Sequence, residues 1–274
     1  MNREQTRAAW DGIAAGYDEF VTGHYFGLGG EALRRAGLSA GMRFLDVACG
    51  SGGLSVPAAR LGARVLGVDI SPQMIECLNG RAHREGLEIE GRVMDGHALD
   101  LPDDTFDMTG SQFGVMLFPD LPRGLSEMVR VTKANGRVVL IAFGPIEKAE
   151  FFGFFVRAIR AAIPAFTGPT ETPLPFQLGE PEIFRRRLEA AGLRNVQVES
   201  TATEYPIRSG EHLWNWLMNS NPIPSMILAE LRLTAEQTGQ IRSALGRQVR
   251  GRTGGGDVAT LTAAINIGTG TKPS

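Results

Sequence analysis

The stretch FLDVACGSGG, from Phe44 to Gly53, decides the fold of this chain of 274 residues. Its first half is an apolar run, part of an expected strand over 43–47, and its second half breaks into glycines. Glycine permits the backbone angles of a tight turn and leaves out the Cβ atom where a ligand approaches the main chain. A helix is expected immediately afterwards, over 52–61. A strand, a glycine turn and a helix in this order predict a nucleotide-binding loop.

Apolar runs typical of strands alternate with helical segments along the rest of the chain. Continuous apolar runs such as VVLIAF are typical of a strand that is buried on both faces of a sheet. We therefore predict an α/β fold built on a doubly wound, seven-stranded, mostly parallel sheet. The further strands are expected over 64–68, 90–94, 106–111, 137–143, 195–203 and 258–267, and the further core helices over 72–84, 121–132 and 181–191.

The composition narrows the possible partners of the protein. The 28 Lys and Arg residues nearly balance the 30 Asp and Glu residues, and this balance gives no support to binding of nucleic acid. The two cysteines, Cys49 and Cys77, show no metal-ligand spacing, so we expect reduced thiols and no bound metal. The sequence shows neither a signal-peptide pattern nor an apolar run that would span a membrane, and we expect a cytoplasmic protein.

Three acidic positions and one serine bear on which nucleotide the turn binds. Asp69 ends the second expected strand, 19 positions after Gly50 (69 − 50), where a carboxylate accepts ribose hydroxyls of NAD or S-adenosylmethionine (SAM) alike. Ser55 stands where a dinucleotide fingerprint needs its third glycine. Asp46, inside the first strand, could meet the ammonium of an amino-acid ligand but would repel a pyrophosphate. The pair Asp95 and Gly96 follows the third strand, where an adenine amino group needs an acceptor. These features favour SAM.

Four segments in order resemble the class I SAM-dependent methyltransferases: FLDVACGSGG, VLGVDIS, RVMDGHALDLPDDTFDMTGSQFGVMLFPD and LSEMVRVTKANGRVVLIAF. They are most similar to the small-molecule branch that includes the ubiquinone- and menaquinone-biosynthesis type. The resemblance covers about residues 8–145 and resumes at the last two strands. It departs at Ala48, where the family usually shows a glycine at or near this position.

The resemblance implies a Rossmann-like fold, SAM as cofactor and S-adenosylhomocysteine as product. It places Gly50, Ser51 and Gly52 under the methionine and ribose parts of SAM, with Asp46 and Ala48 beside them. It assigns the ribose hydroxyls to Asp69. The remaining implied cofactor residues are Ile70, Met74, Asp95, Gly96 and His97 around the adenine, Ser111, Gln112 and Phe113 next to the sulfonium, and Tyr17 on a closing N-terminal helix.

Two segments exceed what the sheet requires and are rich in aromatic and aliphatic residues. We expect an N-terminal helical lid over 1–40, a SAM-binding core over 41–144, a cap insertion over 145–179, a core helix and strand over 180–205, a second cap insertion over 206–256, and the last core strand with the C-terminus over 257–274. An apolar cap predicts a small quinone-like, aromatic, polyketide or terpenoid acceptor. The expected walls of its pocket are Phe20, Phe26, Phe113, Phe118, Trp214 and Trp216.

Methyl transfer from a sulfonium needs an aligned nucleophile and the exclusion of water. A general base is needed only when the acceptor holds its proton at neutral pH. His24, with Tyr25 next to it, follows the expected lid and is our candidate for that base, although each histidine has the alternative of a structural role. The protein is expected to be a monomer or a homodimer.

Other functions stay open at this point. An NAD(P)-dependent oxidoreductase would keep the sheet and Asp69 but would leave Asp46 and Ser55 unexplained. A nucleic-acid methyltransferase would need an acceptor motif where SQFGVMLFPD stands, and a basic surface. A non-catalytic SAM-binding protein is the third alternative.

Overall fold

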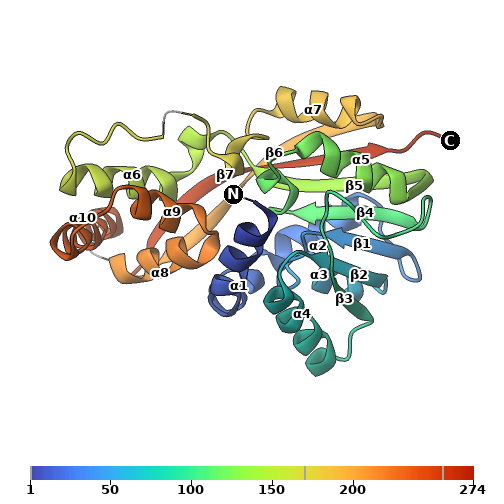
Figure 1. Cartoon of the computed structure of the whole chain (residues 1–274), viewed down its shortest axis with the longest axis horizontal. Coiled ribbons are helices and arrows are strands. Elements are labelled where there is room, and N and C mark those ends of the chain that lie inside the picture. Colours follow the sequence, from blue (N-terminus) through green and yellow to red (C-terminus); the bar gives the residue numbers. More distant parts are fainter. Residues whose placement is uncertain (1, 170, 255) are drawn as a thin grey trace.

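The computed structural model describes residues 2–169, 171–254 and 256–274 (Figure 1). Positions 1, 170 and 255, which fall within the expected lid and the two expected insertions, lie outside the described residues. Seven strands form one sheet in the order β3-β2-β1-β4-β5-β7-β6. The predicted α/β fold with a mostly parallel seven-stranded sheet is confirmed. Within the described ranges, no helix combines the length and hydrophobicity needed to cross a bilayer.

The parallel part of the sheet holds five strands. They are β1 (Arg43–Val47), β2 (Arg64–Asp69), β3 (Ile89–Val93), β4 (Phe106–Gln112) and β5 (Thr132–Phe143). The strand order reverses between β1 and β4, so right-handed crossovers put the helices of the two halves on opposite faces. The connecting helices are α3 (Ser55–Arg60), α4 (Pro72–Glu85) and α5 (Leu121–Val131). A reversal of this kind opens a crevice at the carboxyl ends of the strands.

Local chemistry explains where these helices begin. Ser71 caps α4 because its hydroxyl accepts a hydrogen bond from the backbone N–H of Met74 at 3.1 Å, and Pro72 occupies the first helical position. The helix expected from residue 52 begins only at Ser55, because Gly50 and Gly52 hold positive φ angles of 53° and 106° and prolong the turn. The glycine turn is therefore longer than the sequence pattern predicts.

The last two strands, β6 (Arg194–Ile207) and β7 (Ala259–Thr271), run antiparallel to each other and are longer than expected. Only the second half of β7, from Ile265 onward, pairs with β5. The first half continues with β6 alone, as a two-stranded ribbon that leaves the main sheet (Figure 1). Helix α7 (Pro181–Ala190) covers the part of β6 and β7 that stays in the sheet.

The remaining helices gather around the ribbon and over the crevice (Figure 1). Helices α6 (Glu150–Ala162), α8 (Gly210–Ser220), α9 (Ile223–Glu230) and α10 (Ala235–Thr253) surround the ribbon. The N-terminal helix α1 (Arg3–Phe20) packs against both α4 and α8, and a short 3-10 turn, η1 (Thr22–Tyr25), links it to α2 (Phe26–Arg35). Helix α1 thus bridges the parallel sheet and the helices around the ribbon.

Candidate cofactor and acceptor site

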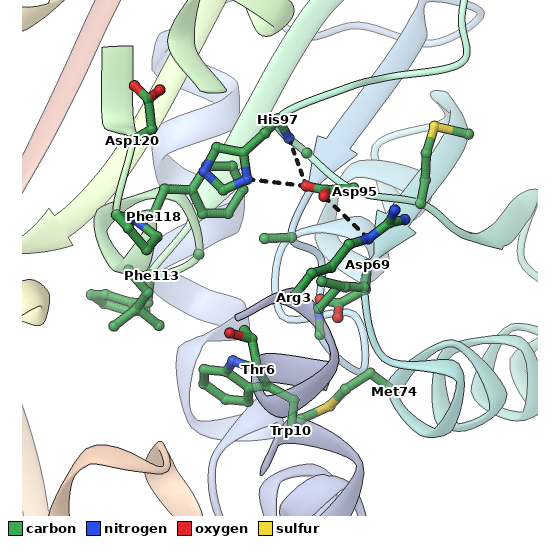
Figure 2. A pocket seen from close by; sticks show the side chains of 18 of the residues that line it. Arg3, Thr6, Trp10, Asp69, Met74, Asp95, His97, Phe113, Phe118 and Asp120 are labelled. Atoms are coloured by element: carbon green, nitrogen blue, oxygen red, sulfur yellow. Dashed lines mark hydrogen bonds and ion pairs between the residues drawn. The ribbon is translucent and has the colours of Figure 1, made fainter. Parts of the chain in front are cut away.

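A cavity of about 280 Å³ lies at the carboxyl ends of the parallel strands, where the strand order reverses (Figure 2). The glycine turn after β1, the ends of β2 and β4, the loop after β3 and helix α1 all contribute to its wall. Most residues predicted to hold the cofactor line it: Tyr17, Ala48, Gly50, Asp69, Ile70, Met74, Asp95, Gly96, His97, Gln112 and Phe113. The other four, Asp46, Ser51, Gly52 and Ser111, are not among its lining residues.

The glycine turn forms one side of the cavity with its main chain. Gly50 has φ +53°, and an added Cβ would lie 3.4 Å from Cε1 of Tyr17, which covers the turn from α1. Ala48 also adopts a left-handed φ of +54°. Glycine occupies such a conformation without cost, which explains why a glycine is common near this position in the resembling family.

Asp69 fixes the turn and faces the cavity. Its carboxylate accepts hydrogen bonds from the backbone N–H of Gly50 and of Ser71, both at 2.9 Å. Burial raises the pKa of Asp69 to about 6, against the opposing effect of these N–H donors. Because this pKa still lies below 7, Asp69 is mainly ionised at neutral pH. Its carboxylate keeps acceptor lone pairs for a ligand diol.

Two buried oxygen atoms near the turn lack a hydrogen-bond partner among the described residues: Oδ1 of Asp46 and Oε1 of Gln112. The other carboxylate oxygen of Asp46 accepts from the Ser55 hydroxyl at 2.6 Å. Burial raises the pKa of Asp46 to about 7. An added Cβ on Gly29 would come within 2.7 Å of Oε1 of Gln112, so the missing side chain there makes room for the amide. Unpaired buried acceptors cost free energy, which an N–H donor within reach would offset. Of the two residues, Gln112 lines the cavity and Asp46, which is fully buried, does not.

The opposite end of the cavity is built around Asp95 (Figure 2). One carboxylate oxygen accepts from the backbone N–H of His97 at 2.9 Å and lies 3.0 Å from Nδ1 of its ring. The other forms an ion pair with Arg3 at 3.3 Å. Burial opposes ionisation of Asp95, but the His97 hydrogen bonds and the Arg3 charge prevail and hold its pKa below the ordinary value. The His97 ring stacks on Phe118 at 4.2 Å, which gives a flat apolar wall next to an acceptor.

A second, smaller cavity of about 30 Å³ lies beyond Phe113, which with Tyr17 belongs to the walls of both cavities. Phe113 has a left-handed φ of +57°, a strained conformation for a bulky side chain and one that concentrates at functional sites. Its ring stacks on Phe143 at 4.8 Å and lies 4.5 Å from Tyr25. We call this second cavity the aromatic compartment; it is lined by Trp10, Tyr17, Val21, Tyr25, Phe113, Met116, Leu117, Phe143, Phe151, Trp216, Ser220 and Asn221.

Only some of the residues predicted for the acceptor pocket and for catalysis line one of the two cavities. Trp216 and Tyr25 line the aromatic compartment and Phe118 lines the larger cavity. Three predicted residues line neither: Phe20 packs against the main hydrophobic core, the Phe26 ring contacts the guanidinium groups of Arg60 and Arg81, and Trp214 faces Arg242. His24 is exposed and stacks on Tyr205 at 5.1 Å, outside the lining of both cavities.

Sequence reasoning missed the contribution of α1 beyond Tyr17. Arg3, Thr6 and Trp10 line the cavity together with Tyr17, and Figure 2 shows Arg3 extending from this helix to Asp95. The spacing 3, 6, 10 and 17 matches one face of a helix, and this periodicity was the available signal. Asp120, after β4, was also missed. Among the described residues, no three His, Cys, Asp or Glu side chains come close enough together to hold a metal ion.

Comparison with known proteins agrees with this geometry. A family described as the methyltransferase domain matches residues 45–140, which run from β1 through most of β5 and include the glycine turn, Asp69 and Asp95. Residues 45–140 therefore form a methyltransferase domain of the class I SAM-dependent type.

Among curated relatives, an uncharacterized protein of Mycobacterium tuberculosis is 36% identical over 138 residues, which are 50% of this chain and 49% of that protein. The chain thus spans about half the length of the mycobacterial relatives it matches. A demethylmenaquinone methyltransferase of Thermus thermophilus is 36% identical over 111 residues, covering 40% of this chain and 50% of that one. A 2-phytyl-1,4-naphtoquinone methyltransferase of Trichormus variabilis is 29% identical over 227 residues, covering 75% and 95%.

Solved structures share the fold. A putative methyltransferase of Bacillus halodurans has a TM-score of 0.60 at 16% identity and covers 90% of this chain and 99% of its own. Phosphoethanolamine N-methyltransferase 2 of Haemonchus contortus, solved in complex with SAM, has a TM-score of 0.58 at 18% identity and covers 96% and 57%. These similarities show a common class I methyltransferase fold.

Proposed function

We propose that this methyltransferase-family protein transfers a methyl group from SAM to a small, largely apolar acceptor. The observation that carries the proposal is the pair of buried, unpartnered oxygens on Asp46 and Gln112 beside the glycine turn. An amino-acid ammonium supplies the N–H donors that these oxygens lack. A pyrophosphate supplies none and would be repelled by the carboxylate, so the pair favours SAM over NAD.

The side chains around the larger cavity suit the other parts of the cofactor. Asp69 would accept the two ribose hydroxyls, because its lone pairs are oriented by the N–H groups of Gly50 and Ser71. Asp95 would accept from the adenine amino group, with Phe118 against the ring. When bound, SAM supplies an electrophilic methyl carbon on a sulfonium. The chain's own contribution is to hold that carbon toward Phe113 and to exclude water.

The aromatic compartment is the proposed acceptor site. Its side chains would have to move apart to admit a ring, because its volume of about 30 Å³ holds about one water molecule. The compartment adjoins the cofactor cavity at Tyr17 and Phe113, and its walls come from α1, η1, the segment after β4, β5, α6 and α8. Such walls exclude water and favour a flat apolar molecule, and aromatic faces near a sulfonium add cation–π attraction of about 0.5–2 kcal/mol for each good contact. Two relatives are named as methyltransferases of menaquinone-type and naphthoquinone compounds, which supports a quinone-like or other aromatic acceptor here.

Calorimetric titration and a methylation screen together test the proposal. The purified protein should bind SAM and S-adenosylhomocysteine and should show no comparable heat with NADH. Aromatic candidate acceptors incubated with SAM should then gain the mass of one methylene group. Strong binding of NADH without binding of S-adenosylhomocysteine would refute the proposed cofactor, and binding of S-adenosylhomocysteine with no methylation of any small acceptor would favour a non-catalytic protein.

A further inference from the structure

Two buried tyrosines that lie far apart in the sequence share a hydrogen bond beside the aromatic compartment. The hydroxyl oxygens of Tyr25 and Tyr205 lie 2.7 Å apart, and the two residues are 3% and 2% exposed. Tyr25 belongs to η1, before the parallel sheet, and Tyr205 lies on the part of β6 that forms the ribbon with β7. The pair therefore joins two segments that the acceptor site brings together.

Only Tyr25 of this pair lines the compartment. Tyr205 stands behind it, in edge-to-face contact with Phe151 at 5.6 Å and with Trp216 at 5.0 Å. Two other polar side chains of the lining are engaged within their own segment. Ser220 donates to the carbonyl of Leu217 at 3.2 Å, and Oδ1 of Asn221 accepts from the N–H of Ile223 at 3.0 Å.

The number of hydroxyl protons in the pair determines which hydrogen bond remains available to a ligand. Each phenol has one proton and two lone pairs, and one proton is used in the shared hydrogen bond. Burial raises the pKa of Tyr25 and of Tyr205, so both hydroxyls keep their protons at neutral pH. When Tyr205 donates to Tyr25, the proton of Tyr25 is free for a ligand, and its O–H is a stronger donor because the two hydrogen bonds polarise each other.

We propose that Tyr25 donates a hydrogen bond to an oxygen atom of the acceptor, and that Tyr205 is the positioning residue that orients this donor. The inference deepens the proposed function and rests on it. It assigns to the acceptor a hydroxyl or carbonyl oxygen on its aromatic ring, because an apolar molecule without oxygen would leave the Tyr25 proton unsatisfied in a desolvated compartment. The pair thus selects among molecules of similar shape.

Binding of two small aromatic probes tests this inference without knowledge of the natural acceptor. We would load the 274-residue chain with S-adenosylhomocysteine and titrate it with 4-fluorophenol and with fluorobenzene, following the fluorine NMR signal. The two probes differ by one hydroxyl. A single added hydrogen bond predicts that wild type binds 4-fluorophenol about fivefold more tightly than fluorobenzene.

The variants Tyr25→Phe and Tyr205→Phe separate the donor from the positioning residue. Tyr25→Phe should abolish the preference, and Tyr205→Phe should reduce it at least by about half, while both still bind fluorobenzene. Thr109→Val is a matched control, because it breaks another buried hydroxyl pair, to Thr132 at 2.9 Å, that lies outside the lining of both cavities. It should leave the preference unchanged.

A merely structural hydrogen bond would lower stability in both tyrosine variants without changing the ratio of the two affinities, and this result would overturn the inference. A wild-type protein without preference would overturn it too, even if the variants do not fold. A full preference in Tyr205→Phe would remove the positioning role. Failure of wild type to bind S-adenosylhomocysteine would instead refute the proposed function, so the two failures are distinguishable.

Discussion

Replacement of Asp46 by asparagine should stabilise the protein without ligand and weaken its binding of S-adenosylhomocysteine. Asp46 is fully buried, and its pKa is raised by burial from the ordinary 3.8 to about 7. A carboxyl with such a pKa binds its proton more tightly in the folded than in the unfolded chain. The free energy of unfolding therefore falls as the pH rises from about 4 to about 7, and the cost is fully present above pH 7.

The magnitude follows from the difference of about three pKa units. At about 1.4 kcal/mol per unit, ionised Asp46 costs the folded state about 4 kcal/mol at pH 8. Asparagine removes this cost but puts an amide N–H₂ where Oδ1 has no partner, at a cost of about 1–3 kcal/mol. We expect Asp46→Asn to raise the free energy of unfolding by about 1–3 kcal/mol at pH 8. The difference in the free energy of unfolding between Asp46→Asn and wild type should become smaller by about 2–3 kcal/mol when the pH is lowered to 5.

Thermal unfolding without ligand at pH 5 and pH 8, followed by calorimetry with S-adenosylhomocysteine at pH 8, measures both parts. The melting temperature at pH 8 should rise by about 2–4 °C for each kcal/mol. Affinity for S-adenosylhomocysteine should fall by about tenfold or more, because a charge-assisted interaction with the ammonium is lost. A variant that is destabilised equally at both pH values and binds with unchanged affinity would refute the reasoning.

Three further substitutions test other parts of the site. Gly50→Ala places a methyl group 3.4 Å from the Tyr17 ring at a φ of +53°, and calorimetry should show at least about a tenfold loss of S-adenosylhomocysteine affinity. Gly86→Ala is the control, because its φ of +63° gives a similar backbone strain and no atom lies within 4 Å of the added methyl group. It should lower stability by a similar amount and leave that affinity intact. Asp95→Asn should reduce the preference for S-adenosylhomocysteine over S-inosylhomocysteine, which lacks the adenine amino group, and an unchanged preference would place the adenine elsewhere. Trp216→Leu should lower the free energy of unfolding by about 2–4 kcal/mol and change which acceptors are methylated, and altered cofactor affinity would contradict its place in the aromatic compartment.

Local patterns were sufficient to predict the parallel sheet and many of the residues that line the larger cavity. The strand, glycine turn and helix near Gly50 are encoded by neighbouring residues. Asp69 ends β2, and Asp95 lies two positions after the end of β3. Parallel strands bring such positions to one edge, so their proximity follows once the strand order is known. Even so, the helix after the turn begins three residues later than expected, because a pattern of letters does not reveal positive φ angles.

The aromatic compartment is formed by contacts between segments that are distant in the sequence. Fewer of its residues could therefore be predicted from local patterns. The antiparallel ribbon of β6 and β7 brings Tyr205 to Tyr25, 180 positions away, and no local signal encodes that pairing. The aromatic residues of the second expected insertion divide by helix face: Trp216 points to the compartment and Trp214 to Arg242. Residues next to each other on η1 divide in the same way, with Tyr25 buried and His24 exposed.

A crystal structure with S-adenosylhomocysteine tests the central claim most directly. The account predicts the amino-acid end of the ligand beside Gln112 and Asp46, the ribose on Asp69 and the adenine between Asp95 and Phe118. The sulfur should then face Phe113 and the aromatic compartment beyond it. A ligand bound in the reverse direction, or with its adenine in the aromatic compartment, would contradict the account.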